Sequence, residues 1–84
     1  MWVGGYELDL VAARGRTVVF CEVKSKRGAG FGDPLEMVGP EKIRRIRRAA
    51  ELWLVGHPAF RAHAVRFDVV AVRGGKLQCL QAAF

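Results

Sequence analysis

Acidic residues and a lysine alternate along two neighbouring segments near the start of the chain. One residue separates Glu7 from Asp9, and one residue separates Glu22 from Lys24. In a β-strand, residues i and i+2 point to the same face, so each pair would share a face if these segments are strands. Carboxylate oxygens are the ligands that Mg²⁺ and Mn²⁺ prefer. A lysine beside them can orient a water or stabilise negative charge on a phosphate.

The two segments that carry these residues are predicted to be strands of one antiparallel hairpin. Residues 6–13 (YELDLVAA) alternate polar and apolar side chains, and residues 17–24 (TVVFCEVK) are mostly β-branched or aromatic at their start. Alternation with a period of two is typical of a strand, and β-branched residues favour strands. The intervening Arg14-Gly15-Arg16 is typical of a tight turn.

The register of this hairpin decides which acidic side chains meet. A two-residue turn that begins at position 14 would place Glu7 opposite Glu22, whereas one that begins at position 15 would place Asp9 opposite Glu22. Either register puts these carboxylates and Lys24 on one face, and only an odd loop or a bulge would separate them. The same pattern also suits cross-strand ion pairs on a solvated face, which contribute about 0–1 kcal/mol. Spacing alone therefore leaves both a metal site and a solvated face open.

One amphipathic helix and two further strands complete the predicted fold. Residues 40–55 repeat apolar side chains at helical spacing, with Gly39 as N-cap and Pro40 in the first turn. Residues 65–72 and 76–81 are predicted strands joined at a Gly-Gly turn. The order ββαββ predicts an α/β domain in which one main helix packs on a small mixed β-sheet. Because one helix covers only one face, the other face would stay bare, which indicates a second copy or a missing covering segment.

Length and composition limit the class of protein. With 84 residues the chain is expected to be a single domain, 1–84, and its 51% hydrophobic content excludes intrinsic disorder. No apolar run approaches the roughly 20 residues of a membrane helix, and the first residues show no secretory signal. Cys21 and Cys79 lack CxxC spacing. They are expected to be free, buried thiols in a reducing cytoplasm, with a disulfide as the alternative.

Basic residues outnumber acidic ones, 14 to 8, which gives a net charge of +6. This excess favours a nucleic-acid partner over a membrane surface. Lys26 and Arg27 follow the E-x-K segment into a glycine-rich stretch, where they are candidates to contact a nucleic-acid backbone. On the helix, Lys42 and Arg45 could hold phosphates, with a solvated helix face as the alternative. Four large aromatic residues are expected in the core or an interface, not as platforms for bases: Trp2, Trp53, Phe60 and Phe67.

Four separated strings together resemble the YraN family of bacterial proteins: GYELDLVA, VVFCEVKSKR, FGDPLEMVGPEKIRRI and VRFDVVAV. That family belongs to the PD-(D/E)XK nuclease-like superfamily, which includes restriction endonucleases and archaeal Holliday-junction resolvases. The resemblance implies a restriction-endonuclease-like core. It also implies an endonuclease that hydrolyses DNA, branched or damaged DNA included, with Mg²⁺ or Mn²⁺ as cofactor.

The same resemblance assigns roles to individual residues. The superfamily signature, an acidic residue on one strand and E-x-K on the next, matches Asp9 and the run from Glu22 to Lys24. By this likeness Asp9 and Glu22 would bind the metal, and Lys24 would be the catalytic lysine. Glu7 would be a further ligand. Lys42 matches a helix lysine that often faces DNA or the site.

Two points in the resemblance leave the function open. Asp68 matches an aspartate of the family without an assignable role. Relatives also carry a helix before the first motif, so the resemblance implies a domain truncated at its N-terminus.

A nuclease of this kind is expected to be a cytoplasmic homodimer. The alternatives are a catalytically inactive nucleic-acid-binding module of the same fold, or a small basic subunit that docks on an acidic protein.

Overall fold

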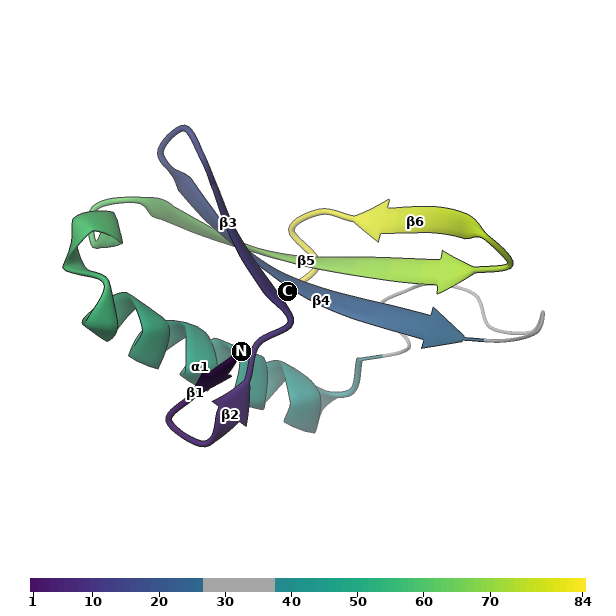
Figure 1. Cartoon of the computed structure of the whole chain (residues 1–84), viewed down its shortest axis with the longest axis horizontal. Coiled ribbons are helices and arrows are strands. Elements are labelled where there is room, and N and C mark those ends of the chain that lie inside the picture. The colour runs from purple at the N-terminus through teal and green to yellow at the C-terminus, as the bar shows by residue number, and fades with distance from the viewer. Residues whose placement is uncertain (27–37) are drawn as a thin grey trace.

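The architecture is a four-stranded sheet with one long helix on it (Figure 1). The computed structural model describes residues 1–26 and 38–84; of Lys26 and Arg73 it describes the backbone only. The elements are, in chain order, β1 (Trp2–Val3), β2 (Tyr6–Glu7), β3 (Leu10–Arg14), β4 (Thr17–Lys26), α1 (Pro40–Gly56), the 3-10 turn η2 (Pro58–Phe60), β5 (Ala64–Arg73) and β6 (Lys76–Leu80). The predicted α/β class with a mixed sheet and one main helix is confirmed.

The sheet has the order β3-β4-β5-β6, in which β4 and β5 run parallel and the other two pairs run antiparallel. The parallel pair is the longest, with every residue of β4 matched to one of β5. Helix α1 lies in the connection between these two strands, as a parallel crossover requires. The hairpin of β3 and β4 closes through Gly15-Arg16, with Arg14 opposite Thr17. This is one of the two registers that the sequence allowed.

The hydrophobic core lies between α1 and one face of the sheet. Alternate residues of β4, Val18 and Phe20, are fully buried there beside Val69 of β5. The helix contributes Trp53, whose ring lies 5.7 Å from that of Phe20 in an edge-on arrangement. Pro40 begins the helix with Gly39 as its cap, as predicted. The apolar periodicity of residues 40–55 therefore corresponds to the buried side of the helix.

Part of the opposite face of the sheet is apolar and uncovered within the described ranges, whereas Val19 and Asp68, which also point away from α1, are buried. Strand register places Leu10, Val23 and Leu77 on this face. Val23 lies between Glu22 and Lys24, which point toward α1, and Leu10 and Leu77 are matched to residues that point away from it. The side chains of Leu10, Val23 and Leu77 are 52%, 43% and 74% exposed. Exposed apolar side chains are thus present on the face that the sequence predicted to be bare, but the face is not bare throughout.

The segment predicted as one strand over residues 6–13 is divided in two. Tyr6 and Glu7 pair with β1, not with β4, and the chain bends at Leu8 and Asp9 before β3 begins. Leu8 explains the bend: its side chain is 2% exposed, and its backbone exchanges two hydrogen bonds with Met1. The alternating pattern could not reveal this division, because it depends on a partner strand that precedes the pattern.

The β1–β2 hairpin is a small unit beside α1. Gly4 and Gly5 form its turn with φ angles of 55° and 84°, which favour glycine at both central positions. A Cβ atom on Gly4 would also collide with the side chain of Leu52 on the helix. The hairpin is therefore held close to α1, where it forms one wall of the site described below.

The structure corrects two expectations about burial and gives Asp68 a structural role. Trp2 is not a core residue, since it is 72% exposed on the short β1 strand. Cys79 is exposed on the edge strand β6, and Cys21 is half-buried; both are free thiols. Asp68 is buried, and hydrogen bonds donated by Arg66 and by the backbone N–H of Ala82 satisfy its carboxylate. None of the helices within residues 1–26 and 38–84 combines the length and apolar character needed to cross a membrane.

Candidate active site

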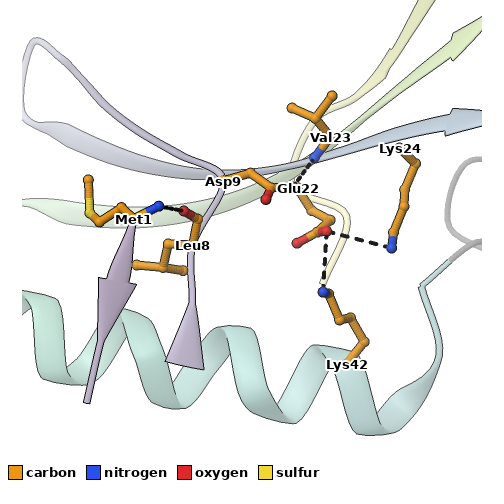
Figure 2. Close-up of polar contacts among 7 residues, drawn as sticks. All are labelled: Met1, Leu8, Asp9, Glu22, Val23, Lys24 and Lys42. Atoms are coloured by element: carbon orange, nitrogen blue, oxygen red, sulfur yellow. Dashed lines mark hydrogen bonds and ion pairs between the residues drawn. The ribbon is translucent and has the colours of Figure 1, made fainter. Parts of the chain in front are cut away.

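The site is centred on Glu22, a carboxylate buried between the sheet and α1. Glu22 follows Val18 and Phe20 along the helix-facing side of β4, and it is only 5% exposed. Two ammonium groups approach its Oε1 atom: Lys24 Nζ lies 3.7 Å away and Lys42 Nζ lies 3.6 Å away. Figure 2 shows the two lysines approaching the carboxylate from β4 and from the helix. Because the lysines are 30% and 40% exposed, their cations lie between the buried acid and solvent.

Asp9 lies beside Glu22, at the bend that precedes β3. Its Oδ2 atom accepts a hydrogen bond from the backbone N–H of Val23 at 3.0 Å (Figure 2). Leu10 pairs with Cys21, so Asp9 continues the hairpin register next to Glu22. The residue spacing thus brings the first acidic residue and the E-x-K segment together, as the register with a Gly15-Arg16 turn predicted.

The surroundings of Glu22 disfavour its charged form. Burial raises the pKa of Glu22 above its ordinary value, and the negative charge of Asp9 raises it further. The ammonium groups of Lys42 and Lys24 act in the opposite direction without cancelling these effects. Two adjacent carboxylates with too little positive charge around them are a favourable environment for an added cation.

Glu7 does not join this pair. It lies on β2 opposite Trp2, outside the four-stranded sheet, so the expected single face of Glu7, Asp9, Glu22 and Lys24 is not formed. Among the residues that the structure describes, no group of three or more His, Cys, Asp or Glu side chains is arranged to hold a metal ion. The expected cluster of three carboxylates was therefore wrong, while Glu7 as a metal ligand stays a prediction.

A hollow of about 360 Å³ opens next to the carboxylate pair, between the β1–β2 hairpin and α1. It is called here the hairpin hollow, and its lining residues are Trp2, Gly5, Tyr6, Glu7, Lys42, Arg45 and Ile46. Lys42 belongs to both features, since it lines the hollow and lies within ion-pair distance of Glu22. Arg45 is 59% exposed and pairs with Glu41 on the same helix at 3.3 Å.

The predicted nucleic-acid-binding residues fall into two groups. Lys42 and Arg45 lie together at the hairpin hollow, one helical turn apart on α1. Lys26 ends β4, but its side chain is not among those described, and Arg27 lies outside the described residues. The sequence reasoning missed the hollow, and with it the exposed Trp2, because the β1–β2 pairing was not recognised. The Gly4-Gly5 pair preceding Tyr6 was the available signal for that hairpin.

Comparison with known proteins identifies close relatives along most of the chain. The sequence signature of the uncharacterised protein family UPF0102 matches residues 1–72. A UPF0102 protein of Acidothermus cellulolyticus is 52% identical over 75 residues, which cover 79% of this chain and 57% of that protein. One from Mycolicibacterium vanbaalenii is 51% identical over 70 residues, 83% of this chain and 57% of the relative. One from Magnetococcus marinus is 42% identical over 82 residues, 93% of this chain and 66% of the relative. The chain thus spans little more than half the length of the first two of these curated relatives.

Proposed function

The chain belongs to the uncharacterised protein family UPF0102, the YraN family, and we propose that it is a divalent-metal-dependent endonuclease that hydrolyses DNA. The observation that carries the proposal is the buried Glu22 carboxylate, with Asp9 beside it and two lysines at 3.6 and 3.7 Å. A buried acid that is only partly neutralised is costly to keep in a small domain unless it has a use. Family membership supports the same site through the resemblance to PD-(D/E)XK nucleases.

The residues present fit Mg²⁺ or Mn²⁺. Asp9 and Glu22 offer carboxylate oxygens, the donors that these hard cations prefer. Burial and Asp9 raise the pKa of Glu22, and a bound cation would favour its charged form. Asp9 and Glu22 would therefore hold the metal. When bound, the metal supplies Lewis-acid chemistry, polarising a phosphoryl oxygen and lowering the pKa of a water.

The chain's own residues position the reaction. The N–H of Val23 holds Asp9 against β4, which fixes the distance between the two acidic side chains. Lys24, next along the same face of β4, would orient the attacking water and stabilise the negative charge that develops on the phosphate. Water then forms a bond to phosphorus while the bond to the leaving oxygen of the strand breaks. Lys42 adds a second cation for the phosphate from the helix side.

Charge and the uncovered sheet face support the remaining parts of the proposal. A net charge of +6, with Lys42 and Arg45 beside the acidic pair, favours the approach of a polyanion such as DNA. The apolar face that carries Leu10, Val23 and Leu77 would be covered by a second copy, which gives a homodimer with two sites. The two cysteines are free thiols, which is consistent with function in the reducing cytoplasm.

A nuclease assay tests the proposal. Plasmid, linear and four-way-junction DNA would be incubated with Mg²⁺, with Mn²⁺ and with EDTA. We expect metal-dependent cutting that Glu22→Gln or Lys24→Ala lowers by about 10²-fold or more. Glu51→Gln is the matched control, since Glu51 is an exposed helix carboxylate paired with Arg48, and it should retain full activity.

Three results would contradict the proposal. Cutting that survives both substitutions would place the activity elsewhere. A folded protein that binds DNA but never cuts it would favour the binding module. Binding only to an acidic protein would favour the interaction subunit.

A further inference from the structure

The hairpin hollow adjoins the acidic pair but is not part of it. Lys42 connects the two, because its side chain lines the hollow and its Nζ atom lies 3.6 Å from Glu22. The β1–β2 hairpin also lines the hollow, and apart from Glu7 its residues have no part in the proposed hydrolysis. A group bound in the hollow would therefore lie beside Lys42, which is within ion-pair distance of Glu22.

The lining of the hollow combines three kinds of chemistry. Ile46 at 3% exposure and the half-buried Tyr6 provide apolar surface. Lys42 and Arg45 provide two cations, and Glu7 provides a carboxylate acceptor. The indole of Trp2 is 72% exposed, although exposed tryptophan is uncommon on a small domain without a partner. An aromatic face, cations and a hydrogen-bond acceptor together match a ligand with a flat ring, an anion and N–H donors.

A nucleotide has these three features. The hollow's volume of about 360 Å³ lies at the small end of ligand sites, which span about 300–1,000 Å³, so one nucleotide unit fits better than a longer segment. Stacking on an aromatic side chain requires a base with a free face, and a base inside a duplex is already stacked on both sides. An acidic peptide would match the cations but gives no reason for the exposed indole.

We propose that the hairpin hollow binds one unpaired nucleotide of the nucleic-acid strand. Its base stacks on Trp2, its phosphate lies at Lys42 and Arg45, and Glu7 accepts a hydrogen bond from a base N–H. The inference rests on the proposed function, because it takes the substrate to be nucleic acid, and it adds that the substrate has a single-stranded or unpaired position at the site. Substrates with flaps, gaps, branches or ends are the class that supplies such a position.

Binding in EDTA tests this inference separately from cleavage. A fluorescein-labelled single strand and the same sequence as a blunt duplex would be titrated with protein, and Kd read from anisotropy. Tryptophan quenching is the second readout: the only other tryptophan, Trp53, is buried at 9% exposure, so quenching would report Trp2. We expect the single strand to bind more tightly than the duplex and to quench the fluorescence.

Matched variants locate the binding. Trp2→Ala should weaken single-strand binding by about 5- to 150-fold, the range of one lost base–aromatic stack. Trp2→Phe should retain most of the affinity because it keeps a ring, and circular dichroism would show that both variants fold. Val55→Ala, at an equally exposed apolar residue of α1 (73%), should change nothing.

A second pair of variants separates a local contact from general charge. Arg45→Ala and Arg48→Ala each remove one exposed, ion-paired arginine from the same helix, but only Arg45 lines the hollow. Arg45→Ala should weaken binding and lower the slope of log K against log salt by about 1, whereas Arg48→Ala should not.

The outcomes distinguish the inference from the proposed function. Equal affinity for single strand and duplex, no effect of Trp2→Ala, or equal displacement by an acidic peptide of matched charge would overturn the inference while leaving metal-dependent cutting intact. Binding that depends on Trp2 in a protein that never cuts would support the inference and contradict the nuclease.

Discussion

The Nζ atom of Lys42 lies 3.6 Å from Oε1 of Glu22, so helix α1 supplies a cation to a carboxylate that β4 carries. Lys24 approaches the same oxygen from β4 itself, at 3.7 Å. Two lysines on one carboxylate would ordinarily stabilise its charge, yet burial and the neighbouring Asp9 outweigh them and the pKa of Glu22 stays raised. The charged form of Glu22 is therefore disfavoured in the folded protein.

Glu22→Gln should stabilise the metal-free protein at neutral pH. Since the pKa of Glu22 is raised on folding, the folded state binds the proton more tightly, and stability is lost as pH rises through the folded value. Removing the charge avoids this loss. We expect a higher Tm for the variant in EDTA at pH 7.5, with the difference shrinking as pH falls toward the ordinary glutamate value of 4.5. Thermal unfolding of both proteins measures the difference in Tm. A lower Tm for the variant at neutral pH would contradict the raised pKa of Glu22.

The same pair of proteins tests the metal without any substrate. Mn²⁺ that binds only the folded protein at 100 times its Kd should add about 2.7 kcal/mol, and each kcal/mol moves Tm by about 4–8 °C in a domain of this size. The natural chain should show this rise and Glu22→Gln should not. Glu51→Gln should behave like the natural chain, because that exposed carboxylate pairs only with Arg48 among the described side chains.

The sequence predicted the elements that are long enough to show a clear periodic pattern. The period of residues 40–55 gave the helix, and the turn at Gly15-Arg16 gave a register that places Asp9 beside Glu22. The division at Leu8 was missed because a two-residue strand, β1, competes for Tyr6 and Glu7, and a short pairing leaves little periodic signal. The exposure of Trp2 follows from that same pairing, so both errors have one cause.

The two cysteines should differ strongly in reactivity. Burial raises the pKa of the Cys21 thiol, and the negative charge of Asp68 raises it further, so the reactive thiolate is scarce at neutral pH. Cys79 is exposed on β6. We expect maleimide at pH 7.5 to label Cys79 about tenfold faster or more. The rate at Cys21 should still be rising above the ordinary thiol value of 9.0. Peptide mass spectrometry measures both rates; equal rates would contradict the described burial.

Asp68 should matter for stability, not for activity. Its carboxylate accepts hydrogen bonds from Arg66 at 2.9 and 3.0 Å and from Ala82 N–H at 3.0 Å, which attach the C-terminal segment to β5. Asp68→Ala should lower the free energy of unfolding by about 1–3 kcal/mol, because it leaves buried donors without partners. Glu51→Ala, which breaks a surface pair, should cost less than about 0.5–1 kcal/mol. Urea unfolding measures the free energy of unfolding of both variants. Equal decreases would mean that the hydrogen bonds of Asp68 do not stabilise the fold.

Dimerisation through the uncovered sheet face predicts that a charge placed there separates the copies. Leu77 is 74% exposed on the face opposite α1, and a lysine would have to be desolvated if a second copy covered it. Sedimentation velocity at tens of micromolar should show a dimer for the natural chain and a monomer for Leu77→Lys. Val55→Lys is the matched control, because Val55 is 73% exposed on the helix side and should leave the dimer intact. A natural chain that sediments as a monomer would leave the apolar face to some other partner, and dissociation by both variants would place the interface elsewhere.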